Sequence, residues 1–504
     1  MTITSEIDWG ARSLARDRAN RSRAFAGIIS LFAGIVFLLA FAWLILAGQF
    51  FLIQLPLILG SLALLIFFGV GYIVNPPVWV GAVILSLLYF GQDFTIRQSL
   101  VSDGGTDLQS LVKGLIAALL MVYGLFNGMS RVFKHPVLWL FAGYAAFAAL
   151  SASYSSAMAL GIGSGLALLG IAFATARAST MSLQDLQTYW RGLYVAAVVM
   201  GVASLILLAV FKPMALDLAD PGAFRLKGFT GSANSLGPIM TVGFIISLTM
   251  YRVAERRWVK NMHAMFGLMM LAALVLTNSR SSLLGLGMGL AAAAVVMRGH
   301  TVLTVLLGGV AATVAAMVVL LPSLTKAFVR AVTELFSRSG GAQEIVSFTG
   351  RSDIWLACLE LIRDKPWIGY GLGSVRVELP KVFEDQWGNT AATAHNFVLE
   401  SLITVGVVGT IPLLLVFVVT TVGLVRHMNM RKSPYQDVVQ REWSACALRV
   451  VFMLWIHALV ERAFAGTAAP STVVLGVCVA TYVYTSMQIR AEKQSRLQRI
   501  REMK

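Results

Sequence analysis

Long apolar runs constrain this chain more than any other feature of its sequence. A helix needs about 20 residues to cross roughly 30 Å of hydrocarbon, and fourteen runs of about that length follow one another along the 504 residues. Because 58% of the residues are hydrophobic and only 13% are charged, most of the chain cannot form the surface of a soluble fold. We predict an all-α polytopic membrane protein with about 12–14 transmembrane helices. The expected spans are 24–47, 51–74, 78–96, 109–127, 136–153, 157–176, 192–211, 233–251, 262–278, 281–297, 301–321, 397–425, 445–463 and 470–487.

The basic residues between these runs indicate how the chain is oriented. Lys and Arg number 40 against 24 acidic residues, and positive residues stay on the cytoplasmic side of a membrane protein. If the N-terminus is inside, both termini and the inner connections receive 24 of the 40 basic residues. We therefore expect segments 1–23 and 488–504 to be cytoplasmic. The excess of positive charge is then explained by the orientation of the chain in the membrane rather than by nucleic-acid binding.

One outer connection, residues 322–396, is far longer than the others. It separates two transmembrane bundles, 24–321 and 397–487, and we expect it to form an ectodomain, because long loops in compact proteins are usually functional. It contains a helix pattern that Ser352 can cap and that Pro366 ends. The apolar positions of that helix are Ile354, Trp355, Cys358, Leu359 and Ile362.

The segment in which this connection re-enters the membrane combines a histidine with two glycines. His395 and Asn396 precede the apolar run, and Gly406 follows eleven residues after His395. Eleven steps of about 100° make about three turns, so both residues would share one face of a straight helix, roughly 16 Å apart. Gly406 and Gly409 would leave a groove on that face for a second helix or an acyl chain. The alternative is a polar cap above an ordinary small-residue packing face.

Three arginines lie at outer helix ends or in the ectodomain: Arg225, Arg280 and Arg351. A guanidinium near the bilayer needs a partner, and phosphate is an anion that it binds bidentately. Each arginine could instead reach lipid headgroups, and Arg351 could pair with Asp353 at a helix start. Together with His395 on the same side, they indicate an anion-binding site.

Aromatic residues and glycines lie near these charges in the ectodomain. The aromatic residues could stack on sugar rings, or they could belong to the aromatic belt of the membrane interface. They are Trp355, Trp367, Tyr370 and Trp387. The glycine run from Gly369 to Gly373 has no strand before it, so we interpret it as a tight turn rather than a nucleotide site.

Other chemistries have little support in the sequence. Cys358, Cys446 and Cys478 are an odd number of cysteines, which excludes a disulfide framework. No Asp-x-Asp or His-x-x-x-His pair occurs, and the outer segments contain no Gly-x-Ser-x-Gly elbow. We therefore expect neither a metal nor another cofactor. Glu461 and Arg462, at the end of an apolar run, are expected to pair with each other.

These residues resemble the O-antigen ligase and Wzy-type polysaccharide polymerase superfamily. That family's pattern is His, then Asn, Ser or Gln, nine residues, Gly, two residues, and Gly, Thr or Tyr. Here the pattern is filled by His395, Asn396, Gly406 and Gly409. The rest of the family's ectodomain block resembles Gly350-Arg351, Trp355, Pro366 and Gly369-Tyr370-Gly371, and its two other functional arginines resemble Arg225 and Arg280. The resemblance covers about residues 220–425.

The resemblance implies a GT-C-like fold and a glycosyltransferase of the bacterial inner membrane, with its active site facing the periplasm. The implied donor is an undecaprenyl-pyrophosphate-linked oligosaccharide, the acceptor is a glycan or lipid A core, and a chain-length regulator is a further partner. His395 would be the base, and Arg225 and Arg280 would neutralise the leaving pyrophosphate. The implied substrate-binding residues are Arg351, Asn396, Trp355, Trp367, Tyr370, Gly406 and Gly409. Transfer would invert the anomeric carbon without a metal.

Several functions share this pattern. We expect a polymerase that joins repeat units of an exopolysaccharide or O-antigen, but a ligase that transfers glycan to lipid A core carries the same motif. A transporter of lipid-linked oligosaccharide could also have fourteen spans, although it would not need an ectodomain with His and Arg at its rim. A scaffold for an envelope synthesis complex would make these residues dispensable.

Overall fold

The computed structural model describes residues 76–92, 108–217, 224–298, 351–384, 390–429 and 438–502. Three expected spans (24–47, 51–74 and 301–321) lie outside the described residues, as does Trp387, and the other eleven each fall on a helix. The helices are α3 (Pro76–Gln92), α4 (Leu108–Asn127), α5 (Pro136–Ser151), α6 (Met158–Ala178), α7 (Leu183–Val210), α8 (Lys212–Ala215), α9 (Ala233–Val253), α10 (Arg257–Thr277), α11 (Arg280–Arg298), α15 (Arg351–Asp364), α16 (Val375–Val382), α17 (Phe397–Asn429), α18 (Val438–Val460) and α19 (Pro470–Glu502).

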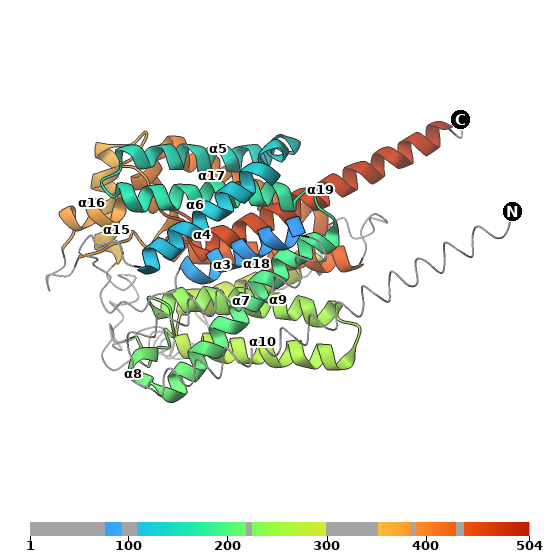
Figure 1. The fold of residues 1–504 in the computed structure, drawn as a ribbon, viewed down its shortest axis with the longest axis horizontal. Helices are drawn as coiled ribbons and strands as arrows, with labels where there is room; N and C mark the ends of the chain where they lie inside the picture. The colour runs from blue at the N-terminus through green and yellow to red at the C-terminus, as the bar shows by residue number, and fades with distance from the viewer. Residues whose placement is uncertain are drawn as a thin grey trace, which may run out of the picture.

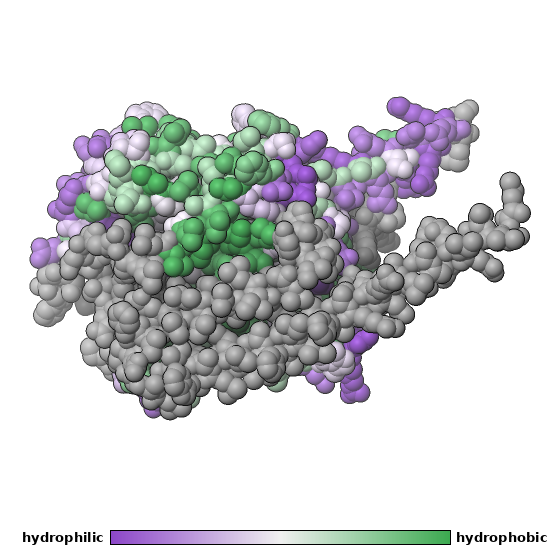
Figure 2. Space-filling view, viewed as in Figure 1, coloured by the Kyte–Doolittle hydropathy of each residue, from purple (hydrophilic) through white to green (hydrophobic). Residues whose placement is uncertain are grey.

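The long helices run side by side along one axis (Figure 1). Within the described ranges, nine are long and apolar enough to cross a membrane: α5, α6, α7, α9, α10, α11, α17, α18 and α19. Two shorter apolar segments, Val78–Gly91 and Val112–Asn127, lie in α3 and α4. Figure 2 shows apolar side chains over the middle of this bundle and hydrophilic ones at its two ends. The prediction of an all-α polytopic membrane protein is confirmed.

Small residues let the helices approach closely. A Cβ on Gly124 of α4 would lie 2.7 Å from Phe173 Cβ, and one on Gly170 of α6 would lie 2.8 Å from Met121 N. Because lipid tails are as apolar as leucine, helices in a membrane associate through such backbone proximity rather than through apolar burial. The opposite face of α4 carries large apolar residues such as Phe126, which is 86% exposed.

Helices α7, α18 and α19 meet around two buried indoles. Trp190 of α7 stacks on Trp443 of α18 with ring centroids 6.0 Å apart, and Trp190 Nε1 donates to Thr481 Oγ1 of α19 at 3.0 Å. Both indoles are fully buried. These contacts fix α18, whose end carries the residues of the candidate site.

The two largest differences from the expected spans are at the start of α7 and the end of α19. Helix α7 begins at Leu183 rather than at 192, because Ser182 Oγ accepts a hydrogen bond from Asp185 N and caps it there. Helix α19 does not stop at 487 but continues to Glu502, so most of the expected tail 488–504 is helical and projects from the bundle (Figure 1). The tail is rich in Arg, Glu, Gln and Lys, which are good helix formers, and backbone hydrogen bonds do not stop at the membrane boundary.

The described part of the long connection 322–396 contains α15 and α16, which lie together at one end of the bundle (Figure 1), hereafter the site end. Helix α15 begins at Arg351, so Ser352 lies inside its first turn and is not its cap, whereas the helix ends before Pro366 as predicted. Its expected apolar face is only partly correct, because Leu359 is 42% exposed. The buried positions are Ala357, Cys358 and Leu361, which pack with Leu379 of α16 and Ile403 of α17.

Helix α17 is broken at Gly406, so the prediction of a straight helix is wrong. Gly406 has φ 60° and ψ −168°, a backbone conformation that glycine adopts readily. The loop after α15 binds both sides of the break. Tyr370 N donates to Ile403 O at 2.7 Å, and Val407 N donates to Pro366 O at 2.9 Å. These bonds pair the backbone groups that the break releases, as burial inside a membrane protein requires.

Candidate functional site

His395 lies in a short loop before α17 whose backbone is held on both sides. Ala394 N donates to Glu400 Oε2 at 2.8 Å, and Ala394 O accepts from Trp355 Nε1 at 3.0 Å. His395 itself has φ 48°, a left-handed conformation that is uncommon outside glycine. Such a conformation persists only where the surrounding structure fixes it, and it is found preferentially at functional sites. The position of the imidazole is therefore set by the fold.

Asn396 connects this loop to two helices. Its Oδ1 accepts from Val398 N at 2.9 Å and Leu399 N at 3.1 Å, so it caps α17. Its Nδ2 donates to Leu459 O at 3.1 Å, near the end of α18. The polar atoms of Asn396 thus hold the histidine loop against α18.

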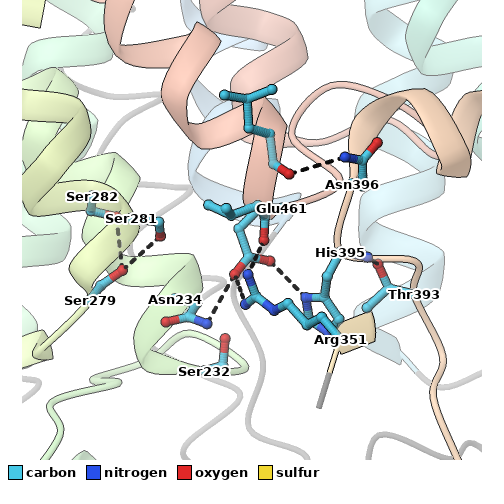
Figure 3. A network of polar contacts seen from close by, with 12 residues as sticks. Ser232, Asn234, Ser279, Ser281, Ser282, Arg351, Thr393, His395, Asn396 and Glu461 are labelled. Carbon is cyan, nitrogen blue, oxygen red and sulfur yellow. Dashed lines mark hydrogen bonds and ion pairs between the residues drawn. The ribbon is translucent and has the colours of Figure 1, made fainter. Parts of the chain in front are cut away.

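The centre of the site is the carboxylate of Glu461, immediately after α18 (Figure 3). One oxygen, Oε2, lies 2.9 Å from His395 Nδ1, and the other, Oε1, lies 2.9 Å from Arg351 Nη2. Asn234 Nδ2 of α9 also donates to Oε1, at 3.1 Å. Arg351 further donates to Val460 O. The expected pairing of Glu461 with Arg462 is wrong, because the next turn aims Arg462 at Thr467 Oγ1, 2.7 Å away.

The surrounding charges keep Glu461 ionised. Burial by itself would raise the pKa of its carboxyl, because a low-dielectric environment disfavours charge. The hydrogen bond and charge of His395, followed by the charge of Arg351, outweigh burial and lower the pKa to about 2. A carboxylate with two oxygens is an acceptor only, so His395 Nδ1 must carry the proton in this contact.

Arg225 is joined to the same carboxylate through one intermediate residue. Its Nη2 donates to Asn234 Oδ1 at 2.7 Å, and Asn234 in turn donates to Glu461. Arg225 Nη1 also lies 4.0 Å from Asp217 Oδ2. Arg225 is only 5% exposed, which means that it lies inside the protein and does not reach lipid headgroups.

Arg280 is the first residue of α11, at the turn after α10. Asn278 ends α10 in the left-handed conformation, and the serine hydroxyls on either side of Arg280 bond one another: Ser279 Oγ lies 3.4 Å from Ser281 Oγ and 3.0 Å from Ser282 Oγ. Figure 3 shows this serine cluster on one side of Glu461 and Asn234, with His395 and Arg351 on the other. The start of α11 therefore faces the same cluster.

Of the remaining expected site residues, Trp355 lies beside the cluster and holds the histidine loop through its indole N–H. Trp367 and Tyr370 belong to the loop at the break of α17, where Trp367 is 68% exposed. The expected groove along Gly406 is filled, because a Cβ there would lie 2.2 Å from Trp367 O, and one on Gly409 would lie 2.5 Å from Val405 Cβ.

Glu461, Asn234 and Glu400 are the residues whose part in this cluster sequence reasoning did not assign. An acidic residue at the end of an apolar run was the available signal for Glu461, but its partners are 66 and 110 residues away in the chain. Among the described residues no group of three or more His, Cys, Asp and Glu side chains gathers to bind a metal ion.

Comparison with known proteins agrees with the motif. No curated protein sequence matches the chain. A sequence model of a family described as O-antigen ligase matches residues 265–414. This segment includes Arg280, Arg351, His395, Gly406 and Gly409, whereas Arg225 and Glu461 lie outside it. Residues 265–414 of the chain match the O-antigen ligase family, as the histidine motif predicts.

Proposed function

We propose that this protein is a membrane glycosyltransferase that polymerises oligosaccharide repeat units carried on undecaprenyl pyrophosphate, for an exopolysaccharide or O-antigen. The observation that carries the proposal is the contact between His395 Nδ1 and Glu461 Oε2 at 2.9 Å, beside Arg351. His395 and Arg351 lie in the segment that matches the O-antigen ligase family, and Glu461 lies outside it. A histidine oriented by a carboxylate is a general base, and clustered arginines are suited to an anionic leaving group.

The pairing defines what each imidazole nitrogen does. Glu461 accepts the proton on Nδ1, which leaves the lone pair on Nε2. In this structure Nε2 has no partner within the described chain, and 30% of the His395 side chain is exposed. In the proposed reaction Nε2 takes the proton of the acceptor hydroxyl while its oxygen bonds to the anomeric carbon. Glu461 then stabilises the imidazolium that forms.

The leaving group determines the role of the arginines. As the bond from the anomeric carbon to pyrophosphate breaks, the electron pair stays on the pyrophosphate. Arg280 and Arg225 neutralise that charge, and Arg351 helps to hold the donor or the acceptor glycan. Direct attack by the acceptor inverts the anomeric carbon. His395 holds the proton of the acceptor hydroxyl during attack and then releases it to water or to the departing pyrophosphate, so this route invokes no metal.

The proposed setting is the bacterial inner membrane, with both termini cytoplasmic and the site end facing the periplasm. The lipid tail of the donor would then lie in the bilayer while the glycan and the pyrophosphate reach the site end. The described residues of the proposed ectodomain, 351–384 and 390–396, would border the site. A chain-length regulator would be a further protein partner.

The test is the amount and length of polymer made by cells that express His395→Ala. We expect at least a 100-fold loss of polymer and accumulation of lipid-linked repeats, since general-base catalysis contributes roughly 10²–10⁴-fold. His263→Ala is the matched control. His263 is a buried histidine near the start of α10, whereas the site lies beyond the other end of that helix, and its imidazole contacts Tyr194. Normal polymer from His395→Ala, at equal protein level, would contradict the proposal.

The same domain family supports a ligase as the second candidate, and a deletion strain distinguishes the two. Loss of high-mass polymer with intact lipopolysaccharide supports the polymerase. Carrier-bound polymer together with bare core supports the ligase. A transporter of lipid-linked oligosaccharide predicts that lipid-linked repeats accumulate on the cytoplasmic side.

A further inference from the structure

His457 is a second histidine near the site that the proposed reaction does not use. It lies on α18 one turn before Glu461, whose N–H donates to His457 O at 2.8 Å. The residue is only 6% exposed, yet neither Nδ1 nor Nε2 has a hydrogen-bond partner. A neutral imidazole always presents one donor and one acceptor, and burying both without partners is unfavourable. Such a group calls for a functional explanation.

The packing of α11 on α18 shows what His457 faces. The contacts are Gly285 with Met453 and Gly289 with Arg449, where an added Cβ would lie 3.2 Å from Met453 Cγ and 2.6 Å from Arg449 O. The two helices are therefore antiparallel. Ser281 lies four residues before Gly285, and His457 lies four residues after Met453. Since residues four apart share a helix face, this register brings Ser281 and the start of α11 opposite His457.

The start of α11 is an anion-binding environment. A helix N-terminus carries a partial positive charge and directs N–H groups at a ligand. Here it also carries the serine cluster and Arg280, and the charges of Glu461 and Arg351 both act on the neighbouring His457. By the register of the two helices, the unpaired imidazole lies opposite this helix N-terminus. Both the imidazole N–H and the helix N-terminus favour an anionic ligand.

We infer that His457 and the start of α11 form the pocket for the pyrophosphate of the lipid-linked donor, with one imidazole N–H donating to a phosphoryl oxygen. This inference rests on the proposed function. Both ring nitrogens are shielded from solvent, and the pair of Arg351 with Glu461 lies one turn further along α18. The proposed pocket therefore lies within one helical turn of the Glu461 carboxylate, which orients His395.

The test measures how inorganic pyrophosphate shifts the unfolding temperature of the purified full-length protein in detergent. Wild type should be stabilised by the ligand, because a ligand that binds only the folded state raises the unfolding temperature. His457→Phe should be more stable than wild type without ligand, since it removes two unpaired polar atoms, and should bind pyrophosphate at least 10-fold more weakly. His457→Gln keeps one donor and should bind with intermediate affinity.

His427→Phe is the control, because His427 of α17 is also buried and has an unpartnered Nδ1, but lies at the other end of the bundle. It should keep the wild-type response to pyrophosphate. The inference would be overturned if pyrophosphate raised the unfolding temperature of His457→Phe as much as that of wild type, or if it did not stabilise wild type. In either case the His395→Ala experiment would still test the glycosyltransferase. Conversely, normal polymer from His395→Ala with lost binding by His457→Phe would keep the anion pocket and reject the proposed reaction.

Discussion

Replacing Glu461 with glutamine tests how the site is held together. The change keeps the size of the side chain but removes the negative charge that His395 and Arg351 share, each at 2.9 Å. A hydrogen bond to a charged group contributes roughly 1.5–3 kcal/mol. The lowered pKa of Glu461 gives a second estimate of this energy. A decrease of the pKa from 4.5 to about 2 corresponds to roughly 3 kcal/mol in favour of the ionised carboxylate in the folded state. We therefore expect Glu461→Gln to destabilise the protein by about 3 kcal/mol.

The same substitution should slow the reaction. If the carboxylate stabilises the imidazolium of the transition state by a similar amount, the turnover of lipid-linked oligosaccharide falls roughly 100-fold. Turnover is measured with purified protein at equal amounts of folded enzyme, and stability by denaturant titration in mixed micelles. The control is Glu442→Gln, because Glu442 pairs at 3.5 Å with the half-exposed Arg252, away from the site. Glu442→Gln should lower the free energy of unfolding by less than about 1 kcal/mol and leave turnover unchanged.

The pH dependence of stability gives an independent check on this reasoning. Because the folded-state pKa of Glu461 is lowered, its contribution is complete above about pH 4.5 and is lost as the pH falls toward 2. The stability difference between wild type and Glu461→Gln should therefore stay constant between about pH 7 and 5 and narrow below that range. Wild-type turnover and stability in Glu461→Gln would refute the assignment of this carboxylate as the partner of His395.

Three further predictions concern the loop, the helix break and the orientation. Gly406→Ala should destabilise the protein by about 3 kcal/mol or more in thermal unfolding, because the positive φ disfavours a side chain and the Cβ would lie 2.2 Å from Trp367 O. The control is Gly143→Ala, where a Cβ meets nothing within 4 Å, and it should be close to neutral in the same measurement. Trp355→Phe removes the indole N–H that holds the histidine loop and should lower turnover roughly tenfold at nearly unchanged stability, whereas Trp367→Phe, at an exposed position, should keep wild-type turnover. The three native cysteines are buried, so a cysteine placed at Arg499 should be the site of maleimide labelling in intact vesicles; labelling from the periplasmic side would reject a cytoplasmic C-terminus.

The site was only partly predictable from the sequence. A motif consists of residues close together in the chain, whereas the side chains that contact one another at the site come from distant segments. His395, Asn396 and the arginines stand out from the sequence by residue type and by position next to apolar runs. The carboxylate that pairs with His395 is 66 residues further along the chain, and its link to Asn234 spans 227 residues. Neither spacing has a periodicity that a sequence pattern could show. The left-handed conformation of His395 is likewise imposed by contacts from α15 and α17.

The amino-acid sequence by itself determined that the chain is a bundle of membrane helices, because an apolar run of about 20 residues satisfies its own backbone hydrogen bonds in lipid and needs no distant partner. The tertiary structure decided which polar groups meet at the site end. It placed Glu461 between His395 and Arg351, broke α17 at Gly406 and buried His457 one turn before Glu461. These outcomes depend on how helices far apart in the chain are packed, since the contact of two side chains is fixed by the distance and register between their helices and not by either segment alone.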